Sequence, residues 1–165
     1  MKSCHSRHSE NVLSLLALGL QVWPDDLPLN LFNAEALAAH GKAEQGLEQI
    51  QAFVTRHPDS LDARMELILL LVKAKRFDEA EKHIGSIAAG ERTPMVDYYH
   101  ARALIGMQRR AEAIPLLQKA IQAMPDFVEA LVELAYAYEQ QKQWNEARSV
   151  YEKLLKLQVS EQDVC

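Results

Sequence analysis

A short string that ends in a small residue recurs along the chain at an almost constant spacing. It reads Arg-Phe-Asp-Glu-Ala at 76–80, Arg-Arg-Ala-Glu-Ala at 109–113 and Gln-Trp-Asn-Glu-Ala at 143–147, with a weaker copy, Lys-Ala-Glu-Gln-Gly, at 42–46. The last residues of these strings are 34, 33 and 34 residues apart. A period of this size indicates an array of repeats, in which each unit buries its apolar face only by stacking on its neighbours.

Two further patterns keep the same register. Pro-Asp follows a helical stretch at 24–25, 58–59 and 125–126, and proline favours the end of a helix just before it. A small residue also occurs in the first half of three units, with isoleucine in that place in the other one: Ala34, Ile68, Ala101 and Ala135. Small residues at facing positions let two antiparallel helices approach closely, so each unit is predicted to be a helical hairpin.

The fold class predicted from this pattern is all-α, an α-solenoid of antiparallel helix hairpins without strands. Nine helices are expected, at 9–22, 27–40, 43–57, 60–74, 77–89, 94–107, 110–124, 127–141 and 144–158. They form a single array over residues 9–161, comprising a half repeat at 9–26 and full repeats at 27–60, 61–93, 94–127 and 128–161. Residues 1–8 and 162–165 are expected to be flexible tails.

The array resembles the tetratricopeptide repeat family, and the four full units cover about four fifths of the chain. The unit at 128–161 matches best, because the family's signature columns hold Leu131, Leu134, Ala135, Tyr138, Ala147, Tyr151 and Leu154. The unit at 27–60 departs most, with Asn30 and Asn33 where large apolar residues are usual and Gly46 in place of alanine. The resemblance implies a right-handed superhelix with an inner groove.

In that family, a fixed set of positions on each first helix tends to face the groove. The resemblance therefore implies a protein-binding groove formed by Leu31, Glu35, Met65, Glu66, Leu69, Val72, Lys73, Met95, Tyr98, Tyr99, Arg102, Ile105, Glu129, Val132, Glu133, Tyr136 and Glu139. As a set they describe an aromatic and aliphatic floor with an acidic margin. Tyrosine and methionine are typical of surfaces that bind a helix or an extended segment.

Composition and motifs argue against other kinds of function. The net charge of −5 and the scattered basic residues do not form the basic face of a nucleic-acid binder. The chain has no glycine loop for phosphates and no hydrolase or zinc-protease motif, so neither an enzyme nor a cofactor site is expected. Cys4, His5 and His8 are too few for a closed metal site, so no metal is expected either.

The one long apolar run, at 12–23, is too short to span a bilayer. Lys2 and Arg7 before it could imitate a signal peptide, but Trp23 and Pro24 follow where a small-residue cleavage site would be. The repeat register interprets the run as the second helix of an earlier unit. A cytoplasmic location is favoured, and a periplasmic one stays open if the chain belongs to a larger exported protein.

The function expected is that of a protein-interaction module, an adaptor, scaffold or chaperone that binds an apolar or amphipathic segment, with basic flanks favoured by the acidic margin. The style of the repeats is typical of bacterial members of the family. A clamp for a C-terminal carboxylate is not expected, because Lys73 and Arg102 are the only basic residues in the groove positions. The alternative is a structural unit that forms homo-oligomers through the open ends of its array.

Overall fold

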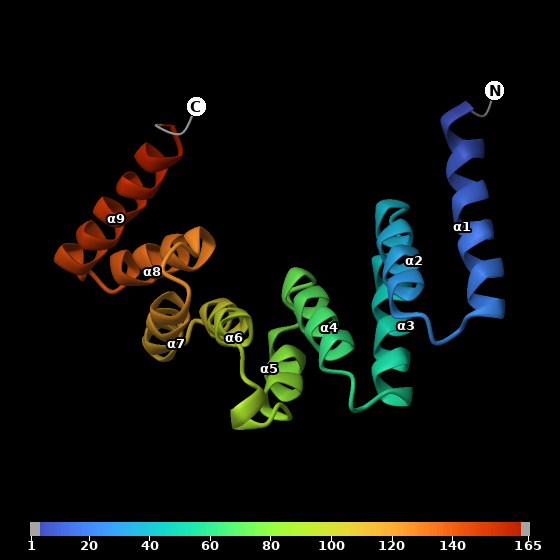
Figure 1. The fold of residues 1–165 in the computed structure, drawn as a ribbon, viewed down its shortest axis with the longest axis horizontal. Coiled ribbons are helices and arrows are strands. Elements are labelled where there is room, and N and C mark those ends of the chain that lie inside the picture. Colours follow the sequence, from blue (N-terminus) through green and yellow to red (C-terminus); the bar gives the residue numbers. More distant parts are fainter. Residues whose placement is uncertain (1–3, 163–165) are drawn as a thin grey trace. The chain divides into compact units, whose positions relative to one another are not determined.

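A computed structural model describes the backbone of residues 4–162 and the side chains of residues 12–157 (Figure 1). Its described residues contain nine α-helices, one short 3-10 helix and no strand. In chain order these are α1 (Cys4–Val22), α2 (Leu27–Ala39), α3 (Ala43–Arg56), α4 (Leu61–Lys73), α5 (Phe77–Gly85), η1 (Ala89–Glu91), α6 (Pro94–Gly106), α7 (Arg110–Ala123), α8 (Val128–Gln140) and α9 (Trp144–Gln162). The chain divides into two compact units, Met1–Leu70 and Leu71–Cys165.

The predicted all-α fold of helical hairpins is confirmed, and six of the helices, α2–α4 and α6–α8, end within one residue of the predicted bounds. The outer helices are longer than expected. α1 begins at Cys4, which places residues 4–8 in a helix and not in the tail expected there, and α9 continues to Gln162. Neither extension contains a glycine or proline, the residues that most strongly end a helix. Residues 1–3 and 163–165 of the expected tails lie outside the described residues.

α5 is the helix that ends earlier than predicted, at Gly85 and not at residue 89. Glycine is a poor helix former, and the Ser86 hydroxyl then donates to the carbonyl of His83 at 2.7 Å, which satisfies one free carbonyl of the last turn. η1 follows, and Thr93 then caps α6 by accepting a hydrogen bond from the amide of Val96, with Pro94 in the first turn.

The turn inside each hairpin has the same backbone conformation in all four full repeats. One residue has a positive φ in each: Gly41 at 74°, Lys75 at 60°, Gln108 at 66° and Lys142 at 60°. The next amide then donates to a carbonyl five residues back, as Arg109 does to Leu104 at 2.8 Å and Gln143 to Tyr138 at 2.9 Å. This is the Schellman ending of a helix, and it explains why the second helix always starts at the same place in the repeat.

The recurring string begins directly after this turn, and its Arg-x-x-Glu spacing has a structural role in two repeats. The Arg76 guanidinium donates two hydrogen bonds to the Glu79 carboxylate, at 2.6 and 2.7 Å. Arg109 binds Glu112 in the same way, at 2.8 and 2.7 Å, and also reaches Glu81 of α5 at 2.8 Å. Each fork ties the turn to the first turn of the following helix, where a carboxylate is favourable.

The structure of the first unit explains two of the three departures noted at 27–60, Gly46 and Asn30. A side chain at Gly46 would have its Cβ only 2.7 Å from the carbonyl oxygen of Ala34, so glycine permits the close approach of α3 to α2. Asn30 is buried and fully bonded: its amide donates to the carbonyls of Pro24 and Asp26, and its oxygen accepts from Gln49. A buried amide with every partner present replaces the usual apolar contact.

The second unit has a continuous core in which α6, α7, α8 and α9 pack in turn. The predicted small positions Ala101 and Ala135 are completely buried, and so are Leu117 and Ala120 on α7. This core fixes which faces of α6, α8 and α9 remain exposed, and those faces are the candidate binding surfaces.

Candidate protein-binding surface

Three aromatic rings join α6 to the start of α8. The Tyr98 ring lies 4.7 Å from the Phe127 ring and 5.2 Å from the Tyr99 ring, centroid to centroid. Tyr98 is only 7% exposed, and burial raises the pKa of its phenol. Tyr98 is one of the predicted groove residues, but its ring is mostly covered by its neighbours and offers a partner little surface.

A charged pair lies beside these rings and links the same two helices. The Arg102 guanidinium lies 5.8 Å from the centre of the Tyr98 ring, and its Nε is 3.4 Å from the Glu133 carboxylate. Both side chains are about two-thirds covered or more. Arg102 is therefore already paired with a carboxylate within the protein.

Apolar side chains remain exposed along one line of α8. Val128, Val132 and Tyr136 are 44%, 50% and 39% exposed, and their spacing of four residues places them on one side of the helix. We call these three residues the α8 stripe. Met95 of α6 is 39% exposed as well. Exposed apolar groups gathered on one face, and not scattered, indicate a contact surface for another molecule.

The remaining predicted residues of the second unit lie at or near these positions. Glu129 is exposed, Glu139, Tyr99 and Ile105 are half-buried, and Lys73 is exposed at the end of α4. Val72 is buried and belongs to the core. Leu31, Glu35, Met65, Glu66 and Leu69 belong to the first unit, where Glu35 is exposed and the other four are half-buried. That they continue the same groove stays a prediction.

Sequence reasoning missed Val128 and Phe127. Val128 is the first residue of its repeat and precedes the positions expected to face the groove. Its spacing of four residues from Val132 could nevertheless have placed both side chains on one side of the helix. Phe127 precedes α8, and its burial against Tyr98 depends on a contact between residues 29 positions apart in the chain. No local pattern predicts such a contact.

A buried acid lies on the other side of α6. Asp97 is 2% exposed, and one of its carboxylate oxygens is 2.8 Å from the Lys119 ammonium of α7. The other oxygen has no hydrogen-bond partner, and neither has Nδ1 of His100. His100 is half-buried, and its Nε2 lies 3.7 Å from the Glu81 carboxylate. Burial lowers the pKa of its imidazole, and Arg92 adds to that effect.

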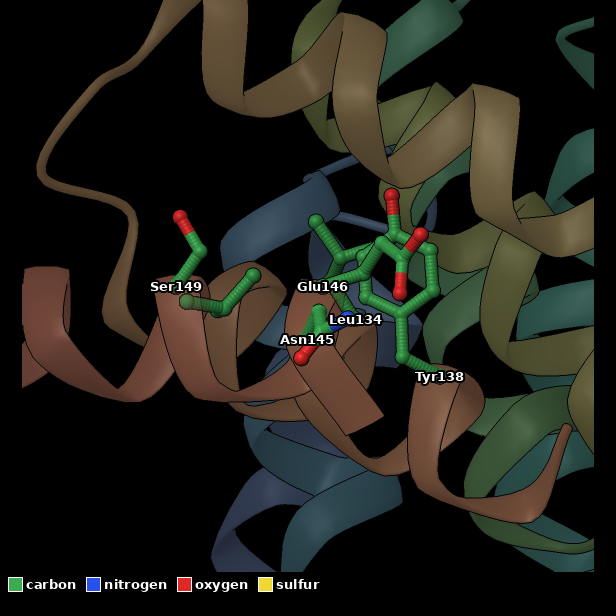
Figure 2. A pocket seen from close by; sticks show the side chains of 6 residues that line it. Leu134, Tyr138, Asn145, Glu146 and Ser149 are labelled. Carbon is green, nitrogen blue, oxygen red and sulfur yellow. The ribbon is translucent and has the colours of Figure 1, made fainter. Parts of the chain in front are cut away.

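A hollow of about 360 Å³ opens between α8 and α9 (Figure 2). Leu134 and Tyr138 of α8 line it together with Asn145, Glu146, Ser149 and Val150 of α9. The Tyr138 hydroxyl accepts a hydrogen bond from Gln118 at 2.8 Å.

The described part of the chain contains neither a metal-ligand cluster nor a membrane-spanning helix. No group of three or more possible metal ligands occurs there. No helix there is long and apolar enough to cross a membrane. Cys4, His5 and His8 have no described side chains, so the structure does not test them.

Comparison with known proteins identifies the repeats. Two tetratricopeptide repeat models match the sequence, one over residues 33–92 and the other over residues 104–163. Together the two matched segments cover well over half of the chain. A search of curated protein sequences gave no match.

Solved structures of MamA proteins share the fold. One is MamA 41-end from Desulfovibrio magneticus RS-1, with a TM-score of 0.79 and 19% identity over 95% of this chain and 90% of that one. Another, described as the crystal structure of MamA, has a TM-score of 0.78 and 18% identity over 96% and 94% of the two chains. MamA AMB-1 has a TM-score of 0.76 and 21% identity over 94% and 93%. At these identities the likeness shows the fold alone. Since the two family models together match most of its length, this all-α chain belongs to the tetratricopeptide repeat family.

Proposed function

We propose that this chain is a protein-interaction module that binds an apolar or amphipathic segment of another protein against α6 and α8. Tetratricopeptide repeats are in general binding modules and not enzymes, which is the coarser function that the family match supports. The finer assignment rests on one observation, the α8 stripe, which leaves three apolar side chains exposed on a single side of a first helix.

The neighbours of the stripe make it a firm platform. Arg102 and Glu133 bridge α6 and α8 on the same side, and the Tyr98, Tyr99 and Phe127 rings pack behind them. A partner segment would therefore meet a surface that needs little ordering, which reduces the entropic cost of association. Tyr136 adds a large contact area with few rotatable bonds, as binding anchors often do.

Charge at the margin favours a particular kind of partner. Glu129 lies on the exposed side of α8 next to Val128, and its carboxylate takes part in no hydrogen bond or ion pair with another described residue. A partner with lysine or arginine beside its apolar positions would gain in encounter rate and in register. The choice among adaptor, scaffold and chaperone depends on what that partner is.

A library of random peptides displayed on phage provides a test that needs no known partner. Selection on the intact chain should enrich peptides with apolar residues at helical spacing and a flanking lysine or arginine. Titration of such a peptide should show affinity at least tenfold lower, or about 1.4 kcal/mol, for Val132→Lys than for the native chain.

Met124→Lys is a matched control, because Met124 is 41% exposed but lies at the end of α7 and outside the stripe. That variant should bind as the native chain does, and circular dichroism should show equal helix content in all three proteins. Enriched peptides that bind Val132→Lys and the native chain equally well would refute the proposal.

A further inference from the structure

The last helix carries a second exposed apolar surface, which is separate from the α8 stripe. Trp144, Tyr151 and Leu155 of α9 are 62%, 40% and 60% exposed. With Glu139, Ala147, Arg148 and Glu152 they line a hollow of about 360 Å³. We call these seven residues the α9 face.

The packing of α9 leaves this face exposed, and its residues have the spacing of a helix contact surface. The neighbouring side of α9 contributes Val150, Leu154 and Leu157 to the core of the second unit, and Ala147 belongs to that core as well. Trp144, Ala147, Tyr151 and Leu155 follow one another at intervals of three or four residues, which is the spacing of a helix–helix seam. Ala147, 3% exposed, forms the floor, and the larger side chains stand around it.

The charges on the α9 face match a copy of itself. Arg148 and Glu152 are one helical turn apart, and their side chains are 81% and 55% exposed with an ion-pair distance of 3.0 Å. A two-fold axis near residues 149–150 would bring a second α9 alongside in the antiparallel direction. Arg148 of each copy would then lie by Glu152 of the other, so that each exposed charge meets its opposite.

The same axis also matches the apolar side chains by size. It places Trp144 beside Leu155 of the second copy, and the Tyr151 ring over the small Ala147 of the second copy. Large side chains facing small ones give the close fit that a helix pair needs.

We propose that two copies of this chain pair through their α9 faces in an antiparallel, two-fold symmetric contact. The α9 face shares no residue with the α8 stripe, and the pairing does not depend on the function proposed above. A single helix pair is at the small end of stable interfaces, so the dissociation constant should be on the order of 10 µM.

Sedimentation velocity of the 165-residue chain tests this over concentrations from about 1 to 300 µM, with a reductant present to keep both cysteines as thiols. The chain should pass from monomer to dimer and stop there. Arg148→Glu and Glu152→Arg should each weaken pairing at least tenfold, because like charges then face each other. The double variant Arg148→Glu/Glu152→Arg should restore pairing to within about threefold, or 0.7 kcal/mol, of the native value.

Lys156→Glu is the control, since it makes the same change of charge on an exposed residue of α9 that does not line the hollow. It should pair as the native chain does, and circular dichroism should show every variant equally helical. A chain that stays monomeric throughout, pairing that the charge reversals do not change, or assemblies that grow beyond the dimer would each overturn the proposal. The proposal would also be overturned if Leu15→Glu of α1 were the only variant that lost pairing.

Discussion

Single residues show where the second unit departs from an apolar core. Asp97 and His100 lie one turn apart on α6, and each has an atom buried without a hydrogen-bond partner. Lys119 and Glu81 supply the neighbouring charges, from α7 and α5. Buried polar groups of this kind cost stability unless their partners are present, so both positions should respond strongly to change.

His100 should make stability depend on pH. Its pKa in the folded protein is lowered from the ordinary value of 6.5 by burial, and further by Arg92, so the unfolded chain binds a proton more readily. Stability should therefore fall as the pH drops below about 6.5, and stop falling below the folded-state pKa. Urea unfolding at several pH values should show this, and His100→Gln should flatten that part of the profile. An unchanged profile in His100→Gln would assign the dependence to other groups.

Lys119 should stabilise the fold through Asp97. Lys119→Met leaves the Asp97 carboxylate buried without its partner, which should cost roughly 1–3 kcal/mol. The double variant Asp97→Leu/Lys119→Met should recover most of the loss, because no buried charge remains. Chemical denaturation measures both. If the double variant were as unstable as Lys119→Met, the loss of stability would come from the shape of the side chains and not from the unpaired charge of Asp97.

At the scale of helices, local chemistry explains why the repeat could be located from sequence. Every hairpin turn has a positive φ residue followed by a Schellman hydrogen bond, and in two repeats an Arg–Glu fork follows directly. These interactions lie within a few residues, so the bounds of six helices could be predicted to within one residue. The ends of α1, α5 and α9 depend on weaker local preferences and were predicted less well.

Gly46 should resist replacement although it lies inside a helix. Alanine is the better helix former by about 1 kcal/mol, but its Cβ would meet the Ala34 backbone at 2.7–3.0 Å. Gly46→Ala should therefore destabilise the protein by about 1–3 kcal/mol in thermal or urea unfolding. Gly85→Ala is the matched control: it has open space around its Cβ and should be neutral or slightly stabilising. Equal effects at both sites would mean that α2 and α3 can move apart freely.

Gln108 should accept glycine with a gain in stability. Its φ of 66° is costly for a residue with a side chain, whereas glycine adopts it readily, as Gly41 does in the equivalent turn. Gln108→Gly should stabilise the folded state by about 0.5–1 kcal/mol, read from the midpoint of urea unfolding. Gln108→Val, which adds a branch at Cβ, should do the opposite, and a stabilising Gln108→Val would contradict this account of the turn.

For the molecule as a whole, the repeat pattern predicted more of the fold than of the binding site. Column positions predict which side of a first helix turns away from its hairpin partner, and Val132 and Tyr136 are exposed on α8. Exposure at each position also depends on the neighbouring repeat. Phe127 covers the Tyr98 ring, and Glu133 pairs with Arg102. These contacts join neighbouring repeats, so the residue pattern of a single repeat does not predict them. The exposure of the α9 face depends likewise on which side of α9 the core covers.

The central claim is that the exposed faces of α6 and α8 bind an apolar partner segment. Backbone amide NMR spectra of the chain, recorded while a peptide selected from the random library is added, test it most directly. The account predicts that the largest shift changes fall on α6 and α8, around Met95, Val128, Val132 and Tyr136, while α9 changes little. Shift changes concentrated on α9 or in the first unit, with α8 unaffected, would contradict it.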